Sequence, residues 1–161
     1  GTVPDSVRAS LTRLGAAGYR VLRWEKDTTV FRDPAKWPAL SVAVTGTHDT
    51  DSLAEWFEAL PAPERKAFLA LPGLAELAAR APERFDSDVR DALLELVYRS
   101  GSDLTLLPFQ DVLGTRERVN VPGTVAEANW TFRMPQDLDA LAADAATTAR
   151  LRDLAQRSGR V

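Results

Sequence analysis

The residues with the clearest potential for chemistry follow an apolar run at positions 40–45. Gly46 and Thr47 come next, and the only histidine of the chain, His48, then stands beside the carboxylate of Asp49. A short apolar run of this kind is typical of a buried strand, and in parallel α/β folds the functional side chains collect where strands end. The pattern therefore predicts an imidazole and a carboxylate at the carboxyl end of a strand, oriented toward a substrate.

A structural interpretation of the same stretch is the start of a helix. Thr50, Asp51 or Ser52 can serve as the N-cap residue. Ser52 followed by Glu55 also matches a capping box, in which each residue satisfies a backbone N–H near the other. Capping accounts for these residues, but it leaves the preceding His-Asp pair unexplained. Both interpretations are open on the local pattern alone.

Composition narrows the class of protein. The chain has 161 residues, of which 45% are hydrophobic and 27% charged, and its net charge is −3. These values are typical of a globular protein with a real core, and the acidic balance argues against a nucleic-acid partner. No apolar stretch approaches the roughly 18 residues of a membrane span, and no signal peptide is visible. We expect no membrane partner and a cytoplasmic location.

The residue inventory also restricts the chemistry. The chain has no cysteine and a single histidine. Disulfides, a thiolate zinc site, a cysteine nucleophile and a multi-histidine metal centre are therefore excluded. We expect neither a metal nor another cofactor.

Hydrophobic periodicity predicts an alternation of strands and helices. We expect strands at 19–24, 40–45 and 103–107, and helices at 5–14, 52–60, 64–71, 74–80, 87–100 and 136–157. Gly15 and Gly101 are expected to end the first and fifth of these helices, and the segments 25–38 and 108–135 are expected to be loops. Strands separated by helices indicate an α/β fold with a parallel sheet.

The number of strands limits the architecture. Three strands cannot close a barrel, which takes about 250 residues when complete. We therefore expect residues 1–161 to form a single segment of a larger barrel, with no separate second domain. Such a segment leaves two strand edges and an apolar sheet face open, so self-association of the isolated chain is expected.

A second informative stretch runs over positions 108–124 and continues at 129–135. It is rich in Gly, Pro and Asn, and it is longer than most loops, which is typical of functional or disordered segments. The interleaved aromatic residues Phe109, Trp130 and Phe132 argue against disorder. We expect Trp130 and Arg133 to support the loop, and Trp37 and Trp56 to belong to the core.

Together with the 47–51 motif and a first motif at 3–8, this stretch resembles the 4-α-glucanotransferases, also called amylomaltases or disproportionating enzymes. The three motifs occur in the family's order. The resemblance implies a (β/α)8 barrel with insertions, of which this chain looks like the C-terminal third, carrying barrel strands six, seven and eight. It also implies a maltodextrin or another α-1,4-glucan as the substrate.

The family's activity sets the expected residue roles. Its members transfer a glucan segment to the 4-hydroxyl of glucose or a glucan with retention, which needs two carboxylates close together. The resemblance puts both of these upstream of Gly1. By motif match Asp49 is the third catalytic carboxylate, and His48 beside it binds the sugar. Asn120 matches a sugar-contacting position.

Trp24 matches a family aromatic on the acceptor side, where its ring would face a glucose ring. Without the resemblance, Trp24 could equally be a core residue and Asn120 a turn residue. A non-catalytic carbohydrate-binding fragment and a retaining α-glucan hydrolase are the alternative functions, and the isolated chain is expected to be inactive.

Overall fold

The computed structural model describes residues 4–160 and is built around a three-stranded parallel sheet. Its strands β1 (Gly18–Val21), β4 (Ser41–Val44) and β5 (Leu104–Thr105) lie in the order β1-β4-β5. Val21 pairs with Val44, and Val42 pairs with Leu104. The predicted α/β class with parallel strands is therefore confirmed.

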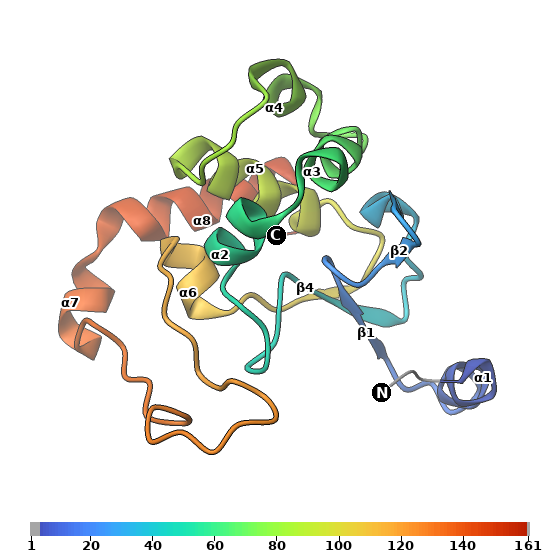
Figure 1. Ribbon diagram of the computed structural model, residues 1–161, viewed down its shortest axis with the longest axis horizontal. Coiled ribbons are helices and arrows are strands. Elements are labelled where there is room, and N and C mark those ends of the chain that lie inside the picture. The colour runs from blue at the N-terminus through green and yellow to red at the C-terminus, as the bar shows by residue number, and fades with distance from the viewer. Residues whose placement is uncertain (1–3, 161) are drawn as a thin grey trace.

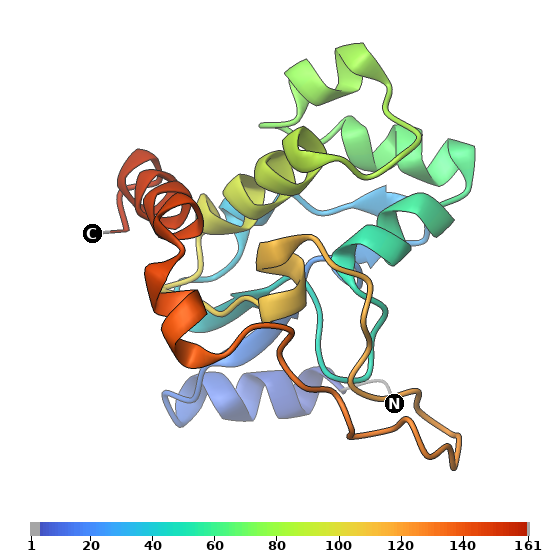
Figure 2. The same cartoon turned by 90° about the vertical axis from the view of Figure 1, so that its left-hand side faces the viewer.

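Most of the helices lie on one side of this sheet (Figures 1 and 2). Along the chain the helices are α1 (Asp5–Arg13), α2 (Leu53–Ala59), α3 (Ala62–Leu69), α4 (Ala75–Arg80), α5 (Ser87–Tyr98), α6 (Phe109–Leu113), α7 (Leu138–Ala143) and α8 (Ala145–Arg157). The group from α2 to α5 covers the sheet, and α1 lies apart from it, across the sheet in Figure 2. Leu22 and Ala43 face the helices and join the main core with Phe57, Phe68 and Leu93.

The two faces of the sheet differ in their environment. Because side chains alternate along a strand, the face opposite the helices carries Val21, Val42 and Val44, which form a small separate cluster. Register places Tyr19 and Leu104 on this same face, and both side chains are more than half exposed. The sheet therefore has one face packed against the main helical core and a second apolar face, where the three valines are buried and Tyr19 and Leu104 are exposed.

The strands are shorter than their apolar patterns predicted. The first ends at Val21 rather than at 24, because the backbone N–H of Trp24 bonds back to the carbonyl of Val21 and turns the chain. The last covers only Leu104–Thr105 rather than 103–107. Trp24 therefore lies in a turn beyond the strand and not at its last position.

The segment 25–38, expected to be a loop, holds regular structure. Strands β2 (Lys26–Asp27) and β3 (Val30–Phe31) form an antiparallel hairpin, and the 3-10 helix η1 (Pro34–Lys36) follows. Trp37 after it is buried, as predicted. Trp56 packs edge-on against Phe31 and Phe68 at the border of the core, as predicted.

Two further differences concern the second half of the chain. Helix α6 begins the segment that was expected to be a loop from 108 onward. The long helix expected at 136–157 is instead divided into α7 and α8, because Asp144 leaves the helical conformation and its side chain caps the first turn of α8.

Gly101 does not cap α5, which ends at Tyr98. A Cβ at position 101 would lie 2.3 Å from the carbonyl oxygen of Trp37, so glycine is needed there for close backbone packing. Gly15, by contrast, follows α1 with a φ of +66°, which fits its predicted role as the stop of that helix.

Within residues 4–160, none of the helices is both long and apolar enough to cross a membrane.

Candidate functional site

The loop of residues 46–52 leaves the carboxyl end of β4 and carries the predicted site pair. It is folded by a turn in which the Thr50 hydroxyl donates to the Thr47 carbonyl oxygen at 2.9 Å and accepts the Thr47 N–H at 2.9 Å. A Cβ at Gly46 would lie 2.6 Å from that hydroxyl oxygen and 3.1 Å from the Arg23 guanidinium. Glycine at this position therefore lets the loop fold tightly against the strand end.

The helix that follows begins with the predicted capping box. The Ser52 hydroxyl accepts the Glu55 N–H, and the Glu55 carboxylate accepts the Ser52 N–H. Asp51 has a different role, because its carboxylate pairs with Arg118. Capping thus explains Ser52, and the preceding His48 and Asp49 lie in the loop, outside the cap.

Three predicted site residues meet in one cluster. The side-chain amide of Asn120 donates to Asp49 Oδ1 at 2.7 Å, and His48 Nε2 lies 3.3 Å from the same oxygen. The backbone N–H of Asn120 also donates to the His48 carbonyl oxygen at 3.2 Å. Part of the long segment that follows α6 passes beside the 46–52 loop in Figures 1 and 2. The imidazole and the carboxylate are each about half exposed, so a ligand can reach them.

Trp130 contacts this cluster, although the sequence suggested only a role in supporting the loop. Its ring centroid lies 5.1 Å from that of His48 at an interplanar angle of 38°. The residue has a φ of +65° and is 61% exposed. A left-handed conformation is costly for a bulky residue and tends to occur at functional sites. The only sequence signal for it is an aromatic residue in a loop rich in small and polar residues.

Arg118 connects the two segments that build the cluster. Its guanidinium pairs with Asp51, and Nη2 also lies 3.4 Å from the carbonyl oxygens of both Asp49 and Asn120. One arginine therefore bridges the 46–52 loop and the segment that carries Asn120. Sequence reasoning placed Arg118 inside a motif but gave it no function.

Trp24 lies outside these contacts. Its side chain is 58% exposed, so the core interpretation does not describe it within this chain. In the described residues, the hydrogen bonds and ring contacts of the His48–Asp49–Asn120 cluster do not include it. The ring is therefore accessible for stacking but is not joined to the cluster.

A buried polar group lies beneath the loop. The Asp111 side chain accepts a hydrogen bond from the Thr45 hydroxyl and another from the Leu53 N–H at 2.7 Å, and the residue is only 2% exposed. Burial raises the pKa of Asp111, and the two hydrogen bonds and the nearby Arg23 charge oppose the rise. Burial likewise lowers the pKa of Arg23, whose guanidinium lies over the Trp56 ring at 5.3 Å.

A cavity of about 260 Å³ opens beside the cluster. Its walls come from both segments, with Thr47, His48 and Asp51 on one side and Arg118 and Val119 on the other. The volume is close to the lower end of the range for small-ligand pockets. The opening is therefore suited to part of a ligand that continues onto the exposed side of the loop.

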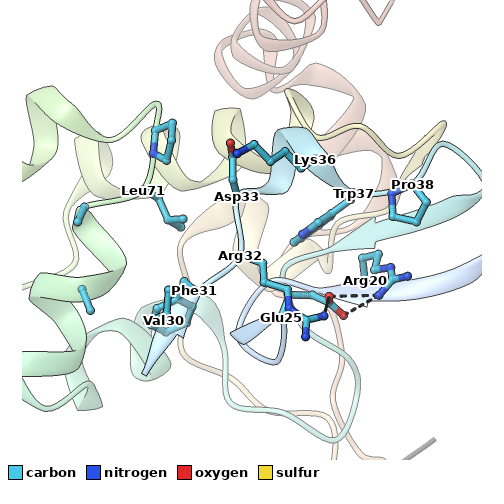
Figure 3. Close-up of a pocket in the computed structure, with 13 residues that line it drawn as sticks. Arg20, Glu25, Val30, Phe31, Arg32, Asp33, Lys36, Trp37, Pro38 and Leu71 are labelled. Carbon is cyan, nitrogen blue, oxygen red and sulfur yellow. Dashed lines mark hydrogen bonds and ion pairs between the residues drawn. The ribbon is translucent and has the colours of Figure 1, made fainter. Parts of the chain in front are cut away.

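A larger cavity of about 750 Å³ lies elsewhere, between the β2–β3 hairpin and α3 (Figure 3). Its lining includes Phe31, Trp37 and Leu71, and the two cavities share no lining residue. Two carboxylates line it, and both have partners: Glu25 pairs with Arg20 and Arg32, and Asp33 accepts the Ala35 N–H. Size alone would favour this cavity, but the only predicted site residue that lines either of the two is His48, at the smaller one.

The chemistry of the cluster is that of hydroxyl recognition. A carboxylate accepts hydrogen bonds from hydroxyl groups, while an imidazole and an amide donate or accept them, and an aromatic ring adjoins the imidazole. No group of three or more His, Cys, Asp or Glu residues that could hold a metal ion occurs in the range 4–160. The arrangement fits a ligand that carries several hydroxyl groups.

The sheet is parallel, and the polar side chains of the cluster meet beyond the carboxyl end of β4. This arrangement defines an α/β protein whose site lies at the carboxyl edge of its sheet. The sequence model of the 4-alpha-glucanotransferases, glycoside hydrolase family 77, matches residues 1–139. The chain therefore belongs to the 4-alpha-glucanotransferase family.

Curated relatives agree with this membership. The 4-alpha-glucanotransferase of Thermus thermophilus is 34% identical over 140 residues, covering 83% of this chain and 27% of the relative. The protein of the same name from Chlamydia pneumoniae is 31% identical over 157 residues, covering 88% of this chain and 28% of the relative. The chain thus spans less than a third of the length of these relatives.

Solved structures give the same assignment. An amylomaltase from Streptococcus agalactiae, in complex with acarbose, superposes with a TM-score of 0.76 at 25% identity, covering 99% of this chain and 30% of that one. An amylomaltase from Corynebacterium glutamicum shares the fold, with a TM-score of 0.66 at 21% identity. The order of helices and strands described above is therefore that of a segment of an amylomaltase.

Proposed function

We propose that this chain forms the carboxyl-terminal part of the catalytic (β/α)8 barrel of a longer 4-α-glucanotransferase. Two observations support this. The chain matches under a third of the length of its relatives, and its parallel sheet has an apolar face that remaining barrel strands would cover. The whole enzyme transfers a segment of an α-1,4-glucan, such as a maltodextrin, to the 4-hydroxyl of glucose or another glucan with retention.

The proposed role of this part is to hold the sugar whose bond is cleaved. One observation carries this proposal: the Asn120 amide donates a hydrogen bond to Oδ1 of Asp49, and His48 Nε2 lies close to the same oxygen. Asp49 hydrogen-bonds sugar hydroxyls, and such bonds strengthen as the ring flattens toward the oxocarbenium-like transition state. The nucleophile and the acid/base carboxylate belong to the remainder of the enzyme.

Trp24 is proposed to contact the acceptor sugar. Its ring is exposed, and the residue lies just beyond the carboxyl end of β1, the strand next to β4 in the sheet. An aromatic face packs well against the apolar face of a glucose ring. This separates the two tasks, with the Asp49 cluster acting on the donor sugar and Trp24 on the incoming one.

Disproportionation of maltotriose by the full-length parent tests the proposal. Transfer yields glucose together with longer maltodextrins, whereas a hydrolase yields glucose and maltose without longer products. Absence of any product from the folded parent would instead favour a non-catalytic carbohydrate-binding protein. Product analysis by chromatography therefore separates the three functions in one experiment.

A further inference from the structure

The carboxylate of Asp111 contacts both ends of the loop that carries the site. Thr45 immediately precedes Gly46, and its hydroxyl donates to Oδ2. Leu53 is the first residue of α2, and its backbone N–H donates to Oδ1 at 2.7 Å. One side chain from α6 thus joins the residue before the 46–52 loop to the residue after it.

From this geometry we propose that Asp111 is a positioning residue for Asp49. Asp111 joins the two ends of the 46–52 loop at its base. This inference rests on the proposed function, because it gives Asp49 a catalytic role. Asp111 is buried beneath the loop and acts through it, without touching the substrate.

The energetics of Asp111 argue against a role in packing alone. Its side chain is almost fully buried, and a buried carboxylate carries a desolvation cost that an apolar residue would avoid. Arg23 is near enough to influence its charge, yet Nη2 of Arg23 has no hydrogen-bond partner among residues 4–160. The hydrogen bonds to Thr45 and Leu53 are therefore the interactions that specifically offset the desolvation cost of Asp111.

Fixing the ends of the loop also fixes Asp49, because the loop has little internal freedom. The Thr47–Thr50 turn and the tight packing at Gly46 constrain its first half. Arg118 approaches the Asp49 carbonyl oxygen from the other segment. Since α6 begins that same segment, Asp111 also sets where Asn120 meets Asp49.

The experiment compares variants of the full-length parent. Asp111→Ala removes both acceptors, and Thr45→Val removes one donor with little change of shape. Asp111→Asn is the conservative variant, because its amide oxygen can accept the Leu53 N–H while its amide nitrogen donates to the Thr45 hydroxyl oxygen. Asp86→Ala is the matched control: Asp86 accepts the Val89 N–H at 2.9 Å and an Arg80 nitrogen at 2.8 Å at the start of α5, away from the loop.

Kinetics supply the first measurement. We expect Asp111→Ala to lower the kcat of maltotriose disproportionation by about 10- to 100-fold, as small misplacements of catalytic groups do, with a smaller change in KM. Asp111→Asn should recover most of this loss, and Asp86→Ala should keep the parental kcat. In an Asp49→Asn background, Asp111→Ala should cost under about threefold more, because the group that it positions has already been disabled.

Hydrogen–deuterium exchange supplies a measurement independent of activity. Exchange of the 46–53 amides should rise in Asp111→Ala and in Thr45→Val, and should not rise in Asp86→Ala. Unchanged exchange in that segment, or fully additive kinetic losses with Asp49→Asn, would overturn the inference. If Asp111→Ala does not fold, Thr45→Val decides alone. If the parent transfers no glucan but exchange of the 46–53 amides rises in Asp111→Ala or Thr45→Val, the proposed function fails. The inference that Asp111 positions the loop and Asp49 then stands.

Discussion

The amide nitrogen of Asn120 lies 2.7 Å from Oδ1 of Asp49, although the two residues are 71 positions apart in the sequence. The same pair of segments is joined a second time by the Asn120 N–H and the His48 carbonyl oxygen. One oxygen of the Asp49 carboxylate is thereby fixed in direction. A carboxylate held in this way can meet a sugar hydroxyl without reorganising, which is the condition for electrostatic help in the transition state.

Replacing Asp49 with Asn in the full-length parent should reduce maltotriose transfer severely while the fold is retained. The charge acts mainly in the transition state, so kcat should fall more than KM rises. By analogy with a lost oxyanion-hole donor, the loss is about 3–4 kcal/mol, or roughly 10²- to 10³-fold. Steady-state kinetics with circular dichroism measures this. Asp139→Asn, an exposed acid on α7, is the control, and near-parental turnover in Asp49→Asn would refute the assignment.

Asn120→Ala should lower kcat roughly 10- to 100-fold, since a hydrogen bond to a charged group contributes about 1.5–3 kcal/mol. Asn120→Asp should be worse, because it places a like charge against Asp49. Kinetics of the two variants side by side tests the order. Near-parental kcat in both variants would show that the bond between Asn120 and Asp49 has no part in the reaction.

Trp24→Ala should weaken acceptor use more than donor cleavage, so the ratio of transfer to hydrolysis should fall. Trp24→Phe keeps a flat ring and should retain more of that ratio. The measurement is the yield of longer maltodextrins against free glucose over time. Val30→Ala removes another exposed side chain, from the β2–β3 hairpin, and should leave the ratio unchanged. An unaltered ratio in folded Trp24→Ala would contradict sugar stacking.

Acid should weaken the contact between α2 and the segment after α6. The Phe85 N–H and the Arg116 guanidinium, opposed by burial, hold the pKa of Glu58 below its ordinary 4.5. A lowered folded-state pKa means that this stabilisation is present above pH 4.5 and is lost as the pH falls through the folded value. The contribution is about 1 kcal/mol or less at this partly exposed pair. Melting temperatures of the parent and of Glu58→Gln should therefore converge toward pH 3, and a constant gap would refute this.

The isolated 161-residue chain should neither transfer glucan nor remain a monomer. Retaining transfer needs two carboxylates about 5–5.5 Å apart, and the proposal assigns both to the rest of the enzyme. The exposed apolar face with Tyr19, Leu104 and Leu106 favours association. Sedimentation should detect oligomers that a Leu104→Gln/Leu106→Gln variant reduces. Activity of the isolated chain on maltotriose would contradict the first part of this prediction. A monodisperse wild-type monomer would contradict the second.

The sequence alone determined the features that depend on short-range order. The apolar run before Gly46 predicted β4, and the Ser52–Glu55 spacing predicted the capping box at the start of α2. Both follow from residues that are neighbours along the chain. The position of His48 and Asp49 beyond a strand end followed from the same local pattern, whereas their roles came from resemblance to a family.

Tertiary structure decided where elements end and which distant groups meet. Strand β1 ends at Val21 because the chain turns at Trp24, although the apolar pattern continues. The contacts of Asp49 with Asn120, and of Thr45 with Asp111, join residues more than 60 positions apart. No periodicity encodes such pairs, because they arise only when α6 and the segment after it pack against the carboxyl end of the sheet.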